Sequence, residues 1–275
     1  MATKGMLHNP SEFFGFPPTN KSDIANKIRR EYRCPFLDII CTKQSRLLHY
    51  PLGVCSVWHQ SSPHIVCPQR FYFEGHELVK DIAKLFLKKK TVCLVPEVRL
   101  AGFGNVDWVA FTQGDNGAVQ DFCGIETVAN DTTQTGQLVR AIEDFLKKGR
   151  LRRRYNFGLN TYNAVKLSFT QIMNKGQVFE SWKKRYIWIL QDTLFANMLE
   201  RFGLELKEGL RKHYIVFVTV KLHHNKNTDL YEVQQDKIYC TSIRQLAKAY
   251  KRESLLPIDD FVKAIERRAQ QGILS

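Results

Sequence analysis

Two acidic residues on the arms of an expected β-hairpin constrain this chain more than any other feature. Two short apolar runs, VDWVAF and VQDFCGIET, are joined by the turn sequence QGDNG. Apolar runs joined in this way predict a hairpin. Asp107 lies in the first arm and Glu126 in the second.

The sequence permits two registers for the hairpin. A turn at Asp115-Asn116 sets Asp107 opposite Gly124 and diagonal to Glu126, whereas a turn at Asn116-Gly117 sets the two acids directly opposite each other. Because side chains alternate along a strand, either register puts both carboxylates on one face of the sheet. The rest of that face is apolar, with Val109, Phe111, Phe122 and Val128.

Two carboxylates within cross-strand reach in an apolar wall cannot both stay ionised without help. Either they share a proton or a cation lies between them. A divalent metal held by facing carboxylates is one way to attack a phosphodiester. The hairpin therefore points to metal-assisted hydrolysis of phosphodiesters.

The bulk properties fit a globular protein. A chain of 275 residues can hold one large domain, or a core with a smaller appendage, and its hydrophobic content of 44% is ordinary. No apolar run approaches the roughly 20 residues that cross a bilayer. The first residues, MATKGMLHNPSEFFGF, lack the apolar stretch of a signal peptide. We therefore expect a cytoplasmic protein with no membrane partner.

The formal net charge of +14 predicts a polyanionic partner, because each neutralised phosphate releases counterions. The basic residues are spread over the chain, which disfavours a membrane surface. The densest run of basic residues, 147–154, is followed by two aromatic residues, Tyr155 and Phe157, which suit stacking on an exposed base. The alternative is a solvated helix end. The expected DNA contacts are Lys147, Lys148, Arg150, Arg152, Arg153 and Arg154, with a second group at Lys175 and Lys183.

Four of the seven cysteines, Cys34, Cys41, Cys55 and Cys67, fall within 34 residues. In a reducing compartment disulfides are disfavoured, and four thiolates can close a tetrahedral shell around zinc or iron. The spacing lacks the close C-x-x-C pairs of zinc ribbons, and the alternative is four small buried core residues.

Periodicity and turn residues predict an α/β protein with a mixed central sheet flanked by helices. Residues 1–75 form an irregular arm followed by the cysteine segment, and residues 76–275 form the core with C-terminal strands and helices. Expected helices cover 22–32, 76–90, 136–154, 159–174, 191–202, 242–250 and 258–271. Expected strands outside the hairpin cover 91–98, 185–190, 213–222 and 229–240.

Several of these residues together resemble a known family. The runs Cys34-Pro35-Phe36-Leu37, Gly53-Val54-Cys55 and Val66-Cys67-Pro68 are similar to the N-terminal segment of the NotI restriction endonuclease family, in which four such cysteines hold a structural iron. Asp107-Trp108, Gly124-Ile125-Glu126 and Asp131-Thr132-Thr133 resemble its PD-(D/E)xK nuclease core, and KLSFTQIM (166–173) resembles the helix behind that site. The resemblance covers about residues 34–190.

The resemblance implies that Asp107 and Glu126 are magnesium ligands and that Glu97 is a candidate outer carboxylate. Sites of this kind carry a lysine, or glutamine in NotI enzymes, two residues after the glutamate, where this chain has Val128. A polar side chain from elsewhere must take that role. The candidates are Asn130, Gln134, Lys166 and Gln171, of which we favour Lys166 for its charge and reach.

The resemblance thus implies a type II-like restriction endonuclease that hydrolyses double-stranded DNA at a specific sequence with magnesium. It would act as a homodimer on a palindrome, with a cognate methyltransferase as a genetic rather than physical partner. Its N-terminal cysteines would hold iron, or zinc. The alternatives are a phage or mobile-element nuclease of looser specificity and a DNA-binding protein on a decayed nuclease core.

Overall fold

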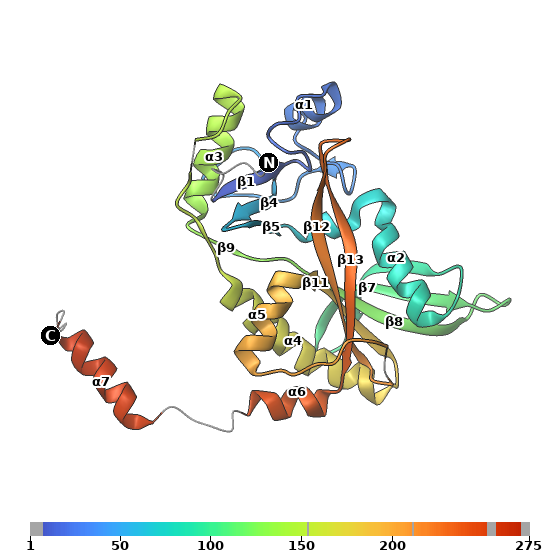
Figure 1. The fold of residues 1–275 in the computed structure, drawn as a ribbon. Coiled ribbons are helices and arrows are strands. Elements are labelled where there is room, and N and C mark those ends of the chain that lie inside the picture. The colour runs from blue at the N-terminus through green and yellow to red at the C-terminus, as the bar shows by residue number, and fades with distance from the viewer. Residues whose placement is uncertain (1–7, 153, 211, 252–256, 271–275) are drawn as a thin grey trace.

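The computed structural model describes residues 8–152, 154–210, 212–251 and 257–270, and its centre is a six-stranded sheet (Figure 1). The strand order is β13-β12-β11-β8-β7-β6. β11 runs parallel to β8 and β12, and the other neighbours are antiparallel, so the sheet is mixed as expected. The strands are β6 (Cys93–Leu100), β7 (Gly104–Gln113), β8 (Val119–Val128), β11 (Arg185–Gln191), β12 (Ile215–Asn225) and β13 (Leu230–Thr241).

The apolar run that forms β11 explains its central place. Every residue from Tyr186 to Gln191 is buried, because helices cover both faces of the sheet at this strand. On one face, α2 (Phe73–Leu87) packs Val79 and Ile82 against the sheet. The other face carries three helices, α4 (Thr161–Ser181), α5 (Asp192–Phe202) and α6 (Ile243–Tyr250).

A second, smaller layer forms at the N-terminus, where we expected an irregular arm ahead of the cysteine segment. Residues 9–13 instead form a fully buried strand. Its side chains pack in the core together with Phe14, and this burial is why the segment is ordered. The described elements here are β1 (Asn9–Phe13), α1 (Asp23–Arg30), β2 (Arg33–Cys34), β3 (Ile39–Ile40), β4 (Val54–His59), β5 (Ser62–Ile65) and the 3-10 helix η1 (Pro68–Tyr72). We call β1 to β5 with α1 the N-terminal module.

The N-terminal module is completed from much later in the chain. Helix α3 (Thr135–Lys148) follows the short strand β9 (Thr132–Thr133), returns to the module and stacks Phe145 on Phe13, with ring centroids 4.8 Å apart. The chain then re-enters the core through β10 (Gly158–Leu159). A boundary at residue 75 therefore does not divide the molecule into two separate hydrophobic cores, because part of the module's core comes from residues 135–157.

A buried ion pair ties the module to the sheet. The Arg70 Nε donates to Glu12 at 3.1 Å, and both side chains are almost fully buried. The guanidinium also donates to the carbonyl of Tyr231 on β13. A buried charge without its partner is costly, so this pair fixes how the N-terminal strand sits against the core.

The last helix stands away from the rest of the molecule (Figure 1). α7 (Ile258–Ala269) has no buried residue. None of the helices in the described ranges is long and apolar enough to cross a membrane.

Candidate functional site

The β7–β8 hairpin places the acidic pair. Trp108 pairs with Ile125 and Val109 with Gly124, which sets Asp107 opposite Glu126. This is the register expected from a turn at Asn116-Gly117. A bulge between Thr112 and Gln113 shifts the pairing nearer the turn. Gly117 adopts a positive φ of 76°, which glycine tolerates at no steric cost.

Asp107 lies just beyond the point where the paired ladder of β7 and β8 ends at Trp108 and Ile125. Its Oδ2 accepts a bond from the backbone N–H of Thr127 at 3.0 Å and another from the Thr127 hydroxyl at 3.2 Å. The Asp107 carboxylate therefore accepts the bond that a backbone carbonyl of β7 would accept from Thr127 in a continuous ladder. Strand alternation would place Thr127 on the opposite face, but it reaches Asp107 because the two strands separate here.

Glu126 is buried, with only 3% of its surface exposed. Its Oε1 accepts bonds from Lys175 Nζ and from the Tyr186 hydroxyl, each at 2.7 Å. Burial, followed by the nearby charge of Asp107, raises the pKa of Glu126 to about 7 despite these two bonds. Burial is thus the main reason that Glu126 resists ionisation, and the neighbouring Asp107 adds to it.

Lys175 reaches Glu126 from α4. Gly176, the next residue, lets the helix approach the sheet closely, because a Cβ there would lie 2.8 Å from Ile243 and 2.9 Å from Ile215. We expected Lys175 to contact DNA from the surface. Its side chain is instead buried, pairs with Glu126 and donates to the carbonyl of Asn105.

Asp107 and Glu126 line one cavity of about 340 Å³ between β8, β11 and α4. Trp188 lines the same cavity, and its register partner on β8 is Glu126. The indole Nε1 of Trp188 is buried and has no hydrogen-bond partner among the described residues. A buried N–H without a partner is costly, so a polar group is expected beside it.

The candidates for the role missing at Val128 divide into two groups. Asn130 and Gln171 line the cavity with the acidic pair. Gln134 and Lys166 line two other cavities. The structure therefore does not bring our favoured residue, Lys166, to the pair.

Glu97 lies opposite Asp107 on β6, between the paired residues Pro96–Trp108 and Val98–Val106. It is exposed and lines, with Asp107, a second cavity of about 440 Å³. Its carboxylate accepts a bond from Asn105 at 3.1 Å. Its φ of 53° is uncommon for a residue with a Cβ, and such strain clusters at functional sites.

The basic stretch lies on the N-terminal module, where α3 ends at Gly149 rather than near residue 154. Lys148 and Arg152 bind Asp144 at 2.9 and 2.6 Å, and these contacts, with Lys148 first, lower the pKa of Asp144 to about 2. Six cations of this stretch and its second group are exposed, of which Lys148 and Arg152 pair with Asp144. The other four are Lys147, Arg150, Arg154 and Lys183, and Arg153 lies outside the described residues.

The aromatic residues after this stretch do not stack on a base. Tyr155 and Phe157 are both buried in the core of the N-terminal module. The Tyr155 hydroxyl donates to Asp144 at 3.0 Å. The expectation of exposed rings was wrong, because α3 and this segment fold back onto the module.

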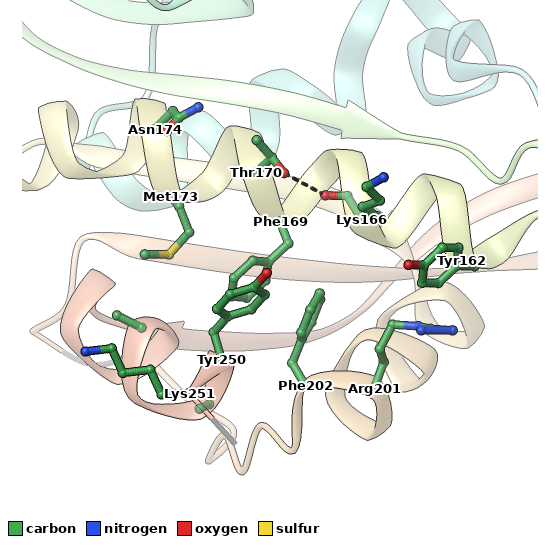
Figure 2. A pocket seen from close by; sticks show the side chains of 12 residues that line it. Tyr162, Lys166, Phe169, Thr170, Met173, Asn174, Arg201, Phe202, Tyr250 and Lys251 are labelled. Carbon is green, nitrogen blue, oxygen red and sulfur yellow. Dashed lines mark hydrogen bonds between the residues drawn. The ribbon is translucent and has the colours of Figure 1, made fainter. Parts of the chain in front are cut away.

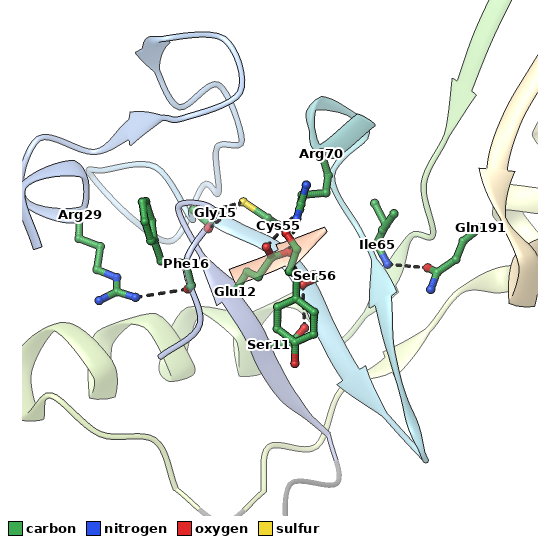
Figure 3. Close-up of polar contacts among 12 residues, drawn as sticks. Ser11, Glu12, Gly15, Phe16, Arg29, Cys55, Ser56, Ile65, Arg70 and Gln191 are labelled. Atoms are coloured by element: carbon green, nitrogen blue, oxygen red, sulfur yellow. Dashed lines mark hydrogen bonds and ion pairs between the residues drawn. The ribbon is translucent and has the colours of Figure 1, made fainter. Parts of the chain in front are cut away.

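The four cysteines of the expected metal site are buried neighbours in the module. Burial is the first cause that raises the pKa of each thiol, and each is affected by the charge of at least one other cysteine of the four. Figure 3 shows the bond from the Gly15 N–H to Cys55 Sγ, at 3.3 Å, beside the Glu12–Arg70 pair. Within the described residues, however, no group of three or more His, Cys, Asp or Glu side chains is arranged so that it could hold a metal ion. The expected shell of four thiolates is therefore not seen.

Sequence reasoning missed three groups that meet at Glu126: Lys175, Tyr186 and Trp188. One signal could have found the first. Ile172 and Phe179 lie on the buried side of α4, and Lys175 falls between them at helical spacing. A lysine in the apolar stripe of a helix requires a buried partner.

We predict that replacing Lys175 destabilises the protein in a pH-dependent way. Lys175→Met removes the positive charge, so the pKa of Glu126 should rise further. A carboxyl whose pKa is raised on folding costs stability as pH rises above its unfolded-state pKa, and that cost is complete once pH passes the folded-state pKa. In the wild type this point is about 7, whereas in the variant it lies higher, so the difference in stability between the two grows above pH 7. We expect a loss of about 3–5 kcal/mol at pH 8.5, measured by urea unfolding, and a smaller loss at pH 6.

The matched control is Lys184→Met, whose partner Asp121 is about half exposed. That variant should lose less than about 1 kcal/mol at both pH values. An equal loss at pH 6 and 8.5 in Lys175→Met would show that Glu126 is not the group responsible.

Comparison with protein-family models places the chain in a known family. The family model described as restriction endonuclease NotI matches residues 20–233 of this 275-residue chain. A search of curated proteins found no match. The matched range includes the cysteine segment, both acids and α4. The chain therefore belongs to the NotI restriction endonuclease family.

Proposed function

We propose that this protein is a type II-like restriction endonuclease that uses magnesium to hydrolyse double-stranded DNA at a specific sequence. Family membership implies an endodeoxyribonuclease. The observation that carries the finer proposal is the meeting of Asp107 and Glu126 in one cavity with a buried lysine at hydrogen-bond distance.

The donor set fits a magnesium ion. Magnesium is bound in proteins by one or two carboxylates, with water and phosphate completing its shell. The bonds that Asp107 accepts from Thr127 end on Oδ2, and those that Glu126 accepts end on Oε1. One oxygen of each acid is thus left for a ligand. A magnesium ion held there would polarise the scissile phosphate and lower the pKa of an attacking water.

Lys175 is our proposal for the role that Val128 cannot fill, in place of Lys166. Its ammonium counteracts part of the rise in the pKa of Glu126 and keeps Oε1 oriented. Glu97 is proposed as the outer carboxylate that holds a water or a second ion, supported by its place opposite Asp107.

DNA is the proposed polyanion that the charge of +14 attracts. The exposed side chains of Lys147, Arg150, Arg154 and Lys183 are proposed phosphate contacts. A homodimer would match a palindromic site and cut both strands. A cognate methyltransferase is proposed as its genetic partner.

A DNA-binding protein on a decayed nuclease core is the second candidate, favoured by Val128. Against it stands the buried Lys175, because a decayed site has no reason to retain a costly buried charge beside two acids. A nuclease of looser specificity would keep the same acidic pair.

We expect the purified protein to cut phage DNA into discrete bands with magnesium. Asp107→Asn should lower the cleavage rate at least about 100-fold, because a metal ligand contributes several kcal/mol to transition-state stabilisation. Retardation of DNA on a gel should persist. The matched control is Asp115→Asn, an exposed acid in the β7–β8 turn, which should cut normally.

Three other results would each decide the question differently. A smear in place of bands would indicate a nuclease of looser specificity. Retardation without any cutting by the wild type would favour the decayed core. Full activity in Asp107→Asn would refute the site assignment.

The buried indole N–H of Trp188 gives a second prediction. We propose that it donates to a water or phosphate oxygen in the cavity. Trp188→Phe removes the donor and retains a buried ring, so cleavage should slow about 3–10-fold, the worth of one neutral hydrogen bond. The free energy of unfolding of the variant should fall only by the small amount that the loss of side-chain volume causes.

The control for Trp188 is Trp182→Phe, at the exposed C-cap of α4. Its rate should match the wild type. An unchanged rate in Trp188→Phe, with Trp182→Phe also unchanged, would exclude a functional role for the indole N–H.

We also propose that Cys34, Cys41, Cys55 and Cys67 hold a structural iron or zinc. The burial of all four thiols in the N-terminal part of the fold supports this, and a bound cation would stabilise the thiolate forms that burial disfavours. Elemental analysis of protein prepared without added metal should find one iron or zinc per chain. Cys55→Ser should lose the metal and much stability, whereas Cys123→Ser, in the central sheet, should keep the metal. Metal-free wild-type protein that is fully folded would exclude the site.

A further inference from the structure

Helix α7 presents an apolar stripe that nothing covers among the described residues. Ile258, Phe261, Val262 and Ile265 follow the helical spacing i, i+3, i+4, i+7 and are between 42% and 77% exposed. A twelve-residue helix is marginal in water unless its apolar face packs on something. The stripe therefore indicates a missing partner.

A hollow of matching chemistry lies beside α6, the helix that precedes α7 in the chain. It measures about 900 Å³ and lies between α4, α5 and α6 (Figure 2). We call it the α4–α6 pocket. Phe169, Phe202 and Tyr250 provide its aromatic surface, with ring centroids 4.0 Å apart for Phe169–Phe202 and 5.4 Å for Phe169–Tyr250. Tyr250 remains 62% exposed although it packs on two rings.

Charge also matches between the two surfaces. The first turn of α7 carries Asp259 and Asp260. The α4–α6 pocket includes two lysines, Lys166 and Lys251. An acidic helix start beside lysines is favourable, and the apolar stripe would lie over the aromatic rings.

We propose that α7 of one chain docks in the α4–α6 pocket of a second copy, with reciprocal exchange that gives a two-fold dimer. Lys251, on the pocket, is the first of seven residues, 251–257, between α6 and α7. Seven residues span at most about 25 Å. Exchange of an identical element between copies is a common route to a dimer.

The proposal does not depend on nuclease activity, because mass and cross-linking report it directly. Full-length protein should sediment as a dimer. The double variant Phe261→Ser/Ile265→Ser should sediment as a monomer at the same concentration, and it should remain folded because neither side chain is buried. Lys263→Ser, on the exposed polar side of α7, is the matched control and should remain a dimer.

Cross-linking then identifies the docking surface. Phe261 is replaced by photoreactive benzoylphenylalanine in a tagged chain, which is mixed with an untagged chain of different mass. A cross-link between the two chains at residues 162–173 or 247–251 supports the proposal. A monomeric wild type, a dimer that survives the double variant, or cross-links only within one chain would each overturn it.

Discussion

The ion pair between Lys175 and Glu126 joins α4 on one face of the sheet to a strand at its centre. Both side chains are nearly fully buried, so neither charge is tolerable without the other. The pair also determines the chemistry. Lys175 offsets one carboxylate, whereas Asp107 adds a second negative charge, and the pKa of Glu126 remains raised. Burial, and after it the charge of Asp107, disfavours two ionised carboxylates here, and the proposed cation would relieve that cost.

The local geometry of β7 and β8 makes this possible. An antiparallel ladder that continued past Trp108 would use the N–H of Thr127 for a strand partner. Here the Asp107 carboxylate accepts that bond, and the strands separate at the point where the cavity forms. The hairpin turn is remote from this opening but sets its register, because a slip of one residue would send Glu126 to the opposite face, away from Lys175.

Sequence patterns predicted the mixed sheet, the hairpin and its facing acids, because strand alternation and turn residues are local signals. They failed where packing between distant segments of the chain determines which side chains are buried. Lys166 and Lys175 are nine residues apart, about two and a half helical turns, so they face opposite ways. Only the side of α4 that meets the sheet could decide between them. The buried strand at residues 9–13 and the buried rings of Tyr155 and Phe157 were missed for the same reason, since α3 returns to the module from a distant part of the chain.

The cysteine segment and the acidic pair are physically linked through one short helix. Cys67 is the N-cap of η1, and Tyr72 ends that helix. Thr127 donates its hydroxyl hydrogen to Asp107, so the Tyr72 hydroxyl must donate to Thr127, at 2.7 Å. Any change that moves the cysteine segment would therefore displace Tyr72 and loosen the Thr127 hydroxyl that orients Asp107. An N-terminal module with no acid of its own in the cavity can thus affect the site through position alone.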